Sequence, residues 1–537
     1  TVAGATGLNV TATAVEAVSN SSVAQVIALI AAEGSSGDKI NLDGDFTVAI
    51  NDTGTVDAAD LNSINTATTG LVTATGVATL TGTSADINTL VGNEGDSGDK
   101  VNLDSDYVAT LTDTTITATV LNLVDSNVPG SVNASTVETI TGIAADINTA
   151  YASSGISGLG DEAVTITDTG AVDSADLNTI NGVTTGLVTA TDVATINGTA
   201  SAITTLLAAE GTSGDKVALD TDFAITVSSG TATVSQANTM AAFSTSGAIT
   251  ASISNTDIAD LDDLSTSSAD QLTITVASTS ATAAQLTTVA GATGLNVTAT
   301  AVETVTGTAT QMDALLAVEG SSGDKVNLDA DYAITINSGT ATVTQANAYA
   351  TAAGVVTATI SDQTIAALDD LTTASTDQLT ITVATGAVTA SALNTVNGAT
   401  GLNVTATSVT GITGTAAEFE TLMDNEGSTG DKMNLDGDFT VTVSNGTTTA
   451  AQLAKIDAKT SKNVDAALVA AISGSASELT TIAAAQGNGD NQYTLKGDAA
   501  LTVTDTGTVD SGDLETIRGM STGFTDATAL TPRPLPK

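Results

Sequence analysis

One loop motif, here called the landmark loop, gathers oxygen ligands at short spacing. Its first copy, EGSSGDKINLDGD, begins at Glu33, and within it Asp38, Asn41, Asp43 and Asp45 offer side-chain oxygens. Two glycines in the motif permit the tight turns that a compact loop needs. Calcium takes about six to eight hard oxygen ligands from carboxylates and amides, so the motif predicts a calcium loop.

The motif returns four more times in intact form. The copies are EGDSGDKVNLDSD from Glu94, EGTSGDKVALDTD from Glu210, EGSSGDKVNLDAD from Glu319 and EGSTGDKMNLDGD from Glu426. A worn copy, QGNGDNQYTLKGD, starts at Gln486. The candidate calcium ligands of the five intact copies are Asp38, Asn41, Asp43, Asp45, Asp99, Asn102, Asp104, Asp106, Asp215, Asp220, Asp222, Asp324, Asn327, Asp329, Asp331, Asp431, Asn434, Asp436 and Asp438.

Each intact loop also carries a Lys, which suggests two alternatives to calcium. In the first, Lys39 neutralises a neighbouring Asp, and the loop is a solvated turn whose Lys–Asp pair stacks from unit to unit. In the second, Lys39 joins Glu33 or Asn41 in an isopeptide bond, although that chemistry needs a buried, aromatic-lined pocket and this motif is polar. The motif is neither an EF-hand loop nor the nonapeptide of a calcium-binding β-roll. Calcium and the structural turn are both open at this point.

A second motif, Asp-Thr-Gly, has the letters of the aspartic-protease signature. It begins at Asp52, Asp168 and Asp505, each time in phase with the repeat and ahead of VDxxDL or a similar segment. In aspartic proteases two such carboxylates share one proton. A turn followed by a helix N-cap explains the motif without any catalysis. The predicted N-caps are Asp57, Asp173 and Asp510.

Threonine is the third recurring group with possible chemistry. Stacked on a flat parallel sheet, Thr-Ala-Thr segments would form a regular hydroxyl array suited to ice or a polysaccharide. The alternative is that Thr is simply a polar residue suited to an exposed strand face. The segments start at Thr11, Thr73, Thr189, Thr298, Thr357 and Thr405.

The composition narrows the possible chemistry. The 537 residues include 60 acidic and 12 basic side chains, a formal net charge of −48, and no Cys or His. Such a chain repels nucleic acid and lacks the commonest general base. No stretch reaches the roughly 18 apolar residues of a membrane span. A polysaccharide lyase would need a basic residue beside its acids, and residues 1–454 offer only the Lys of the landmark loops, so we predict that the protein is not an enzyme.

The spacing of the landmark loops reveals the elements that must position these residues. The loops lie 61, 116, 109, 107 and 60 residues apart, and degenerate copies within the three long intervals follow Ile156, Leu264 and Leu371, so the repeat is about 57 residues. Short alternating runs such as residues 71–75 are typical of strands with one buried face. Segments such as residues 56–65 place apolar residues three or four apart, which predicts short helices.

These elements predict an α/β repeat solenoid in which short parallel strands alternate with short helices, at about 28 residues per rung. The alternative is an all-β parallel solenoid in which the helical segments are turns. We expect residues 1–449 to form tandem repeats in one continuous solenoid, residues 450–530 to be divergent terminal repeats, and residues 531–537 to be a Pro-rich tail. Residues 1–16 repeat residues 288–303 letter for letter, so we expect no capping repeat over the first edge.

Runs such as TGLVTATDVATINGTASAITTLLAAEGTSGDKVALDTDFAITV (residues 185–227) carry a resemblance. They resemble the Thr/Ala/Asp-rich repeats of very large secreted or cell-surface proteins of cyanobacteria and other aquatic bacteria. The resemblance covers nearly the whole chain and rests on composition as much as on motifs. It implies an extracellular, acidic, calcium-tolerant protein with a structural or adhesive role, and it supplies no catalytic residues.

Taken together, these patterns predict an extracellular structural protein. We expect it to assemble head to tail with copies of itself into a filament, sheath or surface layer. The alternative is an adhesin or a module that binds ice or polysaccharide through Thr ladders. The expected partners are copies of the chain and cell-surface polysaccharide, with no nucleic acid and no membrane span, and calcium is the one candidate cofactor.

Overall fold

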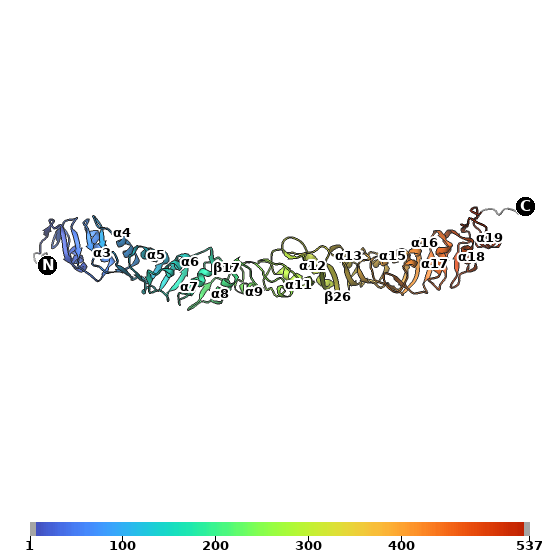
Figure 1. Ribbon diagram of the computed structural model, residues 1–537, viewed down its shortest axis with the longest axis horizontal. Helices are drawn as coiled ribbons and strands as arrows, with labels where there is room; N and C mark the ends of the chain where they lie inside the picture. The colour runs from blue at the N-terminus through green and yellow to red at the C-terminus, as the bar shows by residue number, and fades with distance from the viewer. Residues whose placement is uncertain (1–6, 531–537) are drawn as a thin grey trace. The chain divides into compact units, whose positions relative to one another are not determined.

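The computed structural model of the chain describes residues 7–530, which fold as two units. Unit 1 comprises the residues up to 255 together with 264–273 and 292–294, and unit 2 comprises 256–263, 274–291 and the residues from 295 on. Within each unit the helices and strands follow one another in chain order (Figure 1). The expected tail at residues 531–537 and the first six residues of the expected uncapped edge lie outside the described residues.

Eighteen short helices occur within residues 7–530, and none of them is long and apolar enough to cross a membrane. The helices of unit 1 are α2 (Val23–Ala31), α3 (Ala58–Ala67), α4 (Ser84–Gly92), α5 (Ala118–Asn127), α6 (Ala144–Ala152), α7 (Ser174–Asn181), α8 (Ala200–Ala208) and α9 (Val234–Phe243). Those of unit 2 are α10 (Ile258–Leu261), α11 (Ala283–Gly291), α12 (Ala309–Val318), α13 (Val343–Ala352), α14 (Ile365–Leu368), α15 (Ala390–Gly398), α16 (Ala416–Asp424), α17 (Ala450–Asp457), α18 (Ala476–Ala484) and α19 (Ser511–Gly519).

The strands are short, and the sheets that they form are parallel throughout. The sheets of unit 1 are β1 (Val10–Ala12) with β3 (Ile40–Leu42); β2 (Ala17–Ser21), β4 (Thr47–Ile50), β6 (Val72–Ala74) and β8 (Val101–Leu103); β5 (Thr55–Asp57), β7 (Thr79–Gly82), β9 (Val108–Leu111), β11 (Val132–Asn133) and β13 (Ile156–Ser157); β10 (Thr115–Thr117), β12 (Thr139–Gly142), β14 (Ala163–Ile166), β16 (Val188–Ala190) and β18 (Val217–Leu219); and β15 (Ala171–Asp173), β17 (Thr195–Thr199), β19 (Ala224–Ser229), β20 (Ile249–Ser252) and β21 (Gln271–Thr273).

The sheets of unit 2 follow the same plan. They are β22 (Ser280–Thr282), β24 (Thr304–Thr308), β26 (Ala333–Ser338), β27 (Val356–Thr359) and β28 (Gln378–Thr380); β23 (Val297–Ala299) with β25 (Val326–Leu328); β29 (Gly386–Thr389), β31 (Val409–Gly414), β33 (Thr440–Val443), β35 (Val464–Ala466) and β37 (Tyr493–Leu495); β30 (Val404–Ala406) with β32 (Met433–Leu435); and β34 (Gly446–Thr449), β36 (Val469–Gly474), β38 (Ala500–Val503) and β39 (Thr525–Asp526). The predicted α/β repeat solenoid of parallel strands and short helices is confirmed.

The register of the strand pairs shows how far the chain advances in each rung. Val48 pairs with Val72, and Val72 in turn pairs with Val101, so the second of these rungs is the longer. That longer rung carries a landmark loop. In the rungs of the degenerate loops after Leu264 and Leu371 the interval is shorter than either, as the pairings of Thr250 with Gln271 and of Thr357 with Gln378 show. The expected uniform rung is therefore replaced by rungs of unequal length, because an intact loop adds several residues to a shorter common frame.

The Thr-Ala-Thr segments do not stack on one another, so the expected array built from them is wrong. Their strands β1, β6, β16, β23, β27 and β30 belong to six different sheets. Neighbouring strands are one rung apart in sequence, whereas copies of the segment are two or more rungs apart. A different Thr ladder is present, since Thr117, Thr141, Thr165 and Thr189 pair in turn across β10, β12, β14 and β16.

The core of each unit lies between the strands and the helices and consists mainly of Val, Ile, Leu and Ala. Helix α3 shows how the sequence builds it. The carboxylate of Asp57 accepts a hydrogen bond from the N–H of Ala59 at 2.9 Å, which starts the helix. Leu61 and Ile64, three residues apart on one face, are then fully buried. The strand residue Val72 is equally buried.

Candidate functional site

The landmark loop connects the end of a helix to the next strand. In the first copy it runs from the end of α2 to the start of β3. The N–H of Gly34 donates to the carbonyl oxygen of Ile40 at 2.9 Å, and the N–H of Ile40 donates to that of Ala32 at 2.9 Å. Gly37 has a φ of +78°, which a residue with a Cβ rarely adopts. These contacts close the loop into a compact turn.

In four of the five intact loops the Lys caps the preceding helix. Lys39 donates through Nζ to the carbonyl oxygen of Ala31, the last residue of α2, at 2.9 Å. Lys100 and Lys432 make the same contact with the last residues of α4 and α16, at 3.5 and 2.8 Å, and Lys325 binds the carbonyl oxygen of Ala317, the next-to-last residue of α12, at 2.7 Å. The last carbonyls of a helix have no partner within it and carry partial negative charge. The expected Lys–Asp pair is therefore wrong, since no salt bridge within residues 7–530 involves a loop Lys.

The glycine after the first Glu of the motif makes room for this Lys. A Cβ on Gly34 or Gly95 would lie 3.0 Å from the Cγ of the loop Lys. The aliphatic stem of the Lys therefore passes directly over the glycine on its way to the helix end. The EGxxGDK spacing is explained by this path, with one glycine for the turn and one for the Lys stem.

An Asn from the preceding rung clamps the loop in several copies. Asn296 donates through Nδ2 to the carbonyl oxygens of Gly320 and Lys325, at 2.9 and 3.0 Å. Asn9 and Asn403 hold the loops that begin one rung after them in the same way. Both ends of the loop are thus tied to the rung before it. The clamp explains why GLN precedes the VTAT segment in these copies.

The predicted calcium ligands of one loop differ in their hydrogen bonds and in their burial. Asp43 accepts a hydrogen bond from the N–H of Gly44 at 2.8 Å, and Asp220 and Asp329 bind the following N–H likewise. Asp104 is half-buried, and Asp436 is exposed. The Asn candidates Asn41, Asn102, Asn327 and Asn434 are half-buried strand residues. The carboxylates that flank them are exposed, namely Asp38, Asp45, Asp99, Asp106, Asp215, Asp222, Asp324, Asp331, Asp431 and Asp438.

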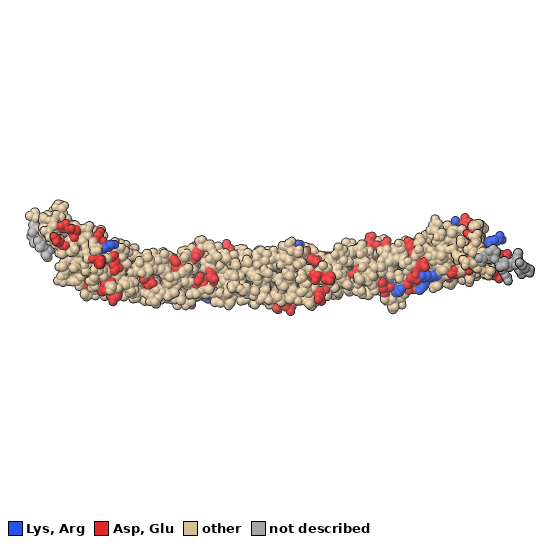
Figure 2. Space-filling model, turned by 45° about the horizontal axis from the view of Figure 1, so that its top comes forward, with Lys and Arg blue, Asp and Glu red and all other residues tan. Residues whose placement is uncertain are grey.

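Acidic side chains do not gather into a metal cluster in the part of the chain that the structure describes. No group of three or more Asp or Glu there is arranged to hold a metal ion. Figure 2 shows the carboxylates of one face in separate patches, with uncharged surface between them. Calcium binding by the landmark loops stays a prediction.

A buried aromatic ring ends each intact landmark loop. The five rings are those of Phe46, Tyr107, Phe223, Tyr332 and Phe439, each at most 3% exposed. Tyr107 and Tyr332 donate their hydroxyls to Glu94 and Glu319, the first residues of their motifs, at 3.4 and 3.1 Å. Burial, and then the adjacent carboxylate, raises the pKa of both phenols above the ordinary value, and burial also raises the pKa of Glu319.

The degenerate loops place a buried carboxylate at the position of the ring, which sequence reasoning missed. The three residues are Glu162, Asp270 and Asp377, at most 5% exposed. Glu162 accepts a hydrogen bond from the N–H of Gly160 at 2.6 Å. Asp270 accepts one from the N–H of Ser267 and one from that of Ile249, both at 2.8 Å. An alignment of the degenerate loops with the intact ones would have shown an acidic residue at the position of the aromatic ring.

The Asp of each Asp-Thr-Gly motif caps a helix of the preceding rung. Asp52 accepts a hydrogen bond from the N–H of Val23, the first residue of α2, at 2.6 Å. Asp168 accepts one from the N–H of Ala144, the first residue of α6, at 2.8 Å. A carboxylate suits the partial positive charge at a helix start. The N-caps predicted at Asp57, Asp173 and Asp510 are confirmed.

Basic residues beyond the landmark loops form ion pairs between rungs. Lys455 of α17 pairs with Asp424 at the end of α16, and Lys459 pairs with Glu426 at 2.5 Å. These partners are partly exposed, so each pair contributes at most about 1 kcal/mol.

Comparisons with known proteins assign no function to the landmark loops. No family model matches the chain, and the search of curated proteins gives no match. The resemblance to the large repeat proteins of aquatic bacteria therefore stays a prediction.

Proposed function

We propose that the protein is an extracellular structural repeat protein that assembles head to tail with copies of itself into a filament, sheath or surface layer. The observation that carries the proposal is that the same kinds of side-chain hydrogen bond join successive rungs in both units. Asp113 binds the N–H of Ser84 at the start of α4, at 2.7 Å. Asn394 of α15 donates to the carbonyl oxygen of Glu418 in α16 at 2.9 Å.

The inter-rung bonds are directional. Where these bonds form, the first N–H of a helix donates a hydrogen bond to a carboxylate of the following rung. The Asn side chains of a rung donate hydrogen bonds to carbonyl groups of the following rung. A rung of a second molecule would present the same groups in the same order. A contact between unlike faces of this kind is head to tail, and it propagates unless it closes into a ring.

The charge supports a place outside the cell. A chain with a net charge of −48 is destabilised by self-repulsion unless cations screen it. The exposed carboxylates of the landmark loops are where such cations would act, and calcium is the cation that we propose. The proposal gives the protein no catalytic role, because the Asp-Thr-Gly carboxylates Asp52 and Asp168 already accept hydrogen bonds from helix N–H groups.

Electron microscopy of the purified protein tests assembly and calcium together. One sample is kept in calcium-containing buffer and a second in the same buffer with a chelator. We expect long uniform fibres or sheets in calcium and their loss in the chelator. Fibres that survive the chelator would contradict the calcium part alone, and discrete particles in both buffers would contradict assembly.

A capped variant tests the head-to-tail contact itself. A version that carries an engineered polar cap before Thr1 is mixed with the unmodified protein. Capped molecules are expected to end growing polymers, so the mean polymer length should fall as their fraction rises. Unchanged polymer length would rule out head-to-tail growth through this end.

A second candidate function, binding of ice or polysaccharide, is favoured by the Thr ladder in β10, β12, β14 and β16. The side-chain hydroxyls of Thr141, Thr165 and Thr189 donate no hydrogen bond to any other group within residues 7–530, and the three residues pair directly. Replacing these three with Val keeps their shape and removes the hydroxyls. Under this function the variant should lose adsorption to ice or to an insoluble polysaccharide while it still assembles.

A further inference from the structure

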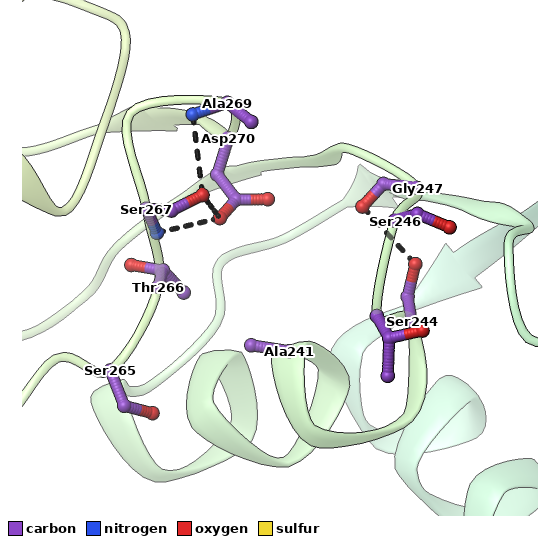
Figure 3. A pocket seen from close by; sticks show the side chains of 10 residues that line it. Ala241, Ser244, Ser246, Gly247, Ser265, Thr266, Ser267, Ala269 and Asp270 are labelled. Carbon is purple, nitrogen blue, oxygen red and sulfur yellow. Dashed lines mark hydrogen bonds between the residues drawn. The ribbon is translucent and has the colours of Figure 1, made fainter.

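One pocket of unit 1 breaks the regular pattern of the rungs. It has a volume of about 210 Å³ and lies between the end of α9 and the segment that leads into β21. In Figure 3 residues 244–247 and 265–270 face each other across this space, with Ala241 of α9 between them. Most of the side chains that line it are Ser or Thr, together with the carboxylate of Asp270.

The pocket forms where a turn has gained one residue. After α3 the connection to the strand is Thr-Thr-Gly (68–70), whereas after α9 it is Ser-Thr-Ser-Gly (244–247). The rung as a whole keeps its length, because Ile225 pairs with Ile249 over the same interval as Val48 with Val72, so the segment before the turn is one residue shorter. Ser244 donates to the carbonyl oxygen of Phe223 at 2.6 Å, as Thr68 does to that of Phe46. The extra residue therefore lies in the turn alone, and the hydrogen bonds that the two rungs share do not involve its side chain.

A matched site in unit 2 lacks the added hydroxyls. Asn238 accepts a hydrogen bond from the N–H of Ser265, and Asn347 accepts one from that of Thr372, both at 2.8 Å, so the two sites correspond. The turn after α13 is only Ala-Gly (353–354), and Ala stands where unit 1 has Ser267. The hydroxyls of Ser246 and Ser267 thus have no counterpart in unit 2, whereas Thr372 stands where unit 1 has Ser265.

The lining suits a neutral polyhydroxy ligand. Ser246 and Ser265 are exposed, and their hydroxyls make no side-chain hydrogen bond within the described residues, so each can both donate and accept. The carboxylate of Asp270 would repel an anion, and its oxygens already bind the N–H groups of Ile249 and Ser267. The methyl group of Ala241 adds a small apolar surface.

We propose that this pocket binds a single neutral sugar ring. Its volume is below the roughly 300–1,000 Å³ of sites for drug-sized ligands, which favours one ring over a longer segment. The lining has no aromatic ring on which a sugar could stack, so the affinity is low, with a dissociation constant on the order of 1 mM. The inference does not depend on assembly of the protein.

Saturation-transfer NMR on the full-length protein tests the proposal with D-glucose, D-galactose and D-mannose as probes. We expect transfer to at least one of them. The double variant Ser246→Ala and Ser265→Ala should weaken that binding by about tenfold or more. Deletion of Ser246, which restores the three-residue turn found after α3, should do the same and keeps the proposal testable if the double variant folds poorly.

The matched control is Thr372→Ala in unit 2, which should leave sugar binding unchanged. Circular dichroism confirms that each variant is folded. Absence of transfer from all three sugars would overturn the proposal. So would binding that persists at full strength in both Ser246 variants, because the sugar would then sit elsewhere.

Discussion

The intact and degenerate landmark loops occupy the same place in the solenoid, but they bury chemically opposite side chains there. An intact loop ends on a buried ring such as Phe439, whereas a degenerate loop ends on a buried carboxylate such as Asp377. The intact loop binds its own backbone and covers an apolar ring. The shorter connection leaves backbone N–H groups turned inward, and these require an acceptor. Loop length therefore decides whether ring or acid is stable at this position.

Exchanging the buried carboxylate and the buried ring between the two kinds of loop should have the largest effect on stability. The oxygens of Asp377 accept hydrogen bonds from the N–H groups of Val356 and Ala374, at 2.8 and 2.9 Å. Asp377→Phe leaves both donors unpaired in the interior, so we expect a local loss of about 3–5 kcal/mol. Phe439→Asp should cost a similar amount, because it places a charge in an apolar site. Hydrogen exchange with mass spectrometry measures both losses.

Asp369→Ala serves as the control for this exchange, since Asp369 is an exposed residue that follows α14. We expect it to change exchange protection by less than about 0.5 kcal/mol. A well-protected Asp377→Phe variant would show that the carboxylate does not hold the short connection.

The Asn clamp is present in only some of the intact loops. Asn403 holds Gly427 and Lys432 through their carbonyl oxygens, at 2.9 and 2.8 Å, whereas Leu71 and Leu187 stand at the same position ahead of two other loops. Asn403→Leu should cost about 1–2 kcal/mol and speed amide exchange in residues 426–433. Leu187→Asn should slow exchange in the loop that begins at Glu210. Equal exchange in clamped and unclamped loops would contradict the role of the clamp.

High pH should weaken the protein through tyrosines that donate their hydroxyls to carboxylates of both kinds of loop. Tyr332 donates its hydroxyl to Glu319 in an intact loop, and Tyr151 donates to Glu162 in a degenerate one, at 3.1 and 2.7 Å. Burial, reinforced by the nearby carboxylate, raises the pKa of each phenol above its ordinary value of 10.0. The folded state then keeps protons that the unfolded state loses, so this stabilisation is full below about pH 10 and is lost as pH rises further.

An alkaline titration followed by tyrosinate absorbance and circular dichroism measures this effect. The phenols should ionise only above their ordinary pKa, in the same pH range in which the protein unfolds. Tyr332→Phe removes one of the buried donors and should make the loss of structure less steep. Ionisation of all tyrosines near their ordinary pKa in a folded protein would contradict the burial of these hydroxyls.

The smallest expected effect concerns the loop Lys. Lys432→Met removes the contact with the last carbonyl of α16 and should cost about 0.3–1 kcal/mol, less at high salt. Lys216→Met is the matched control, because within the described residues Lys216 makes no such contact with α8. Thermal unfolding at low and high ionic strength compares the two variants. Equal losses in both would mean that the cap does not matter.

Much of the fold was predictable because it is local. The capping Asp57 and the apolar spacing of Leu61 and Ile64 lie within one short segment, and both expectations hold in α3. The alternation of polar and β-branched residues likewise predicted the strands. Repetition then supplied the architecture, since a repeated unit with parallel strands stacks into a solenoid.

The contacts that depend on register could not be predicted. Asp168 caps a helix that lies one rung earlier, and that partner becomes visible only when the rung length is known. Lys39 has several Asp neighbours in sequence, yet it binds a backbone carbonyl eight residues before it. The acid Glu162 sits in a polar segment that resembles an exposed turn, although it is fully buried. Side chains alone did not reveal the partners of Asp168 and Lys39, because both partners are backbone groups of another segment.

Residue-resolved amide exchange of the unmodified protein tests the central claim, that side chains of one rung satisfy the helix ends of its neighbour. The first N–H of a helix has no partner within the helix and normally exchanges fast. Ala144 and Val343 have this position and are bound by Asp168 and Asp362, both at 2.8 Å. We predict slow exchange at these two amides and fast exchange at the first amide of α8, which receives no such carboxylate within the described residues. Equally fast exchange at all of them would contradict the account.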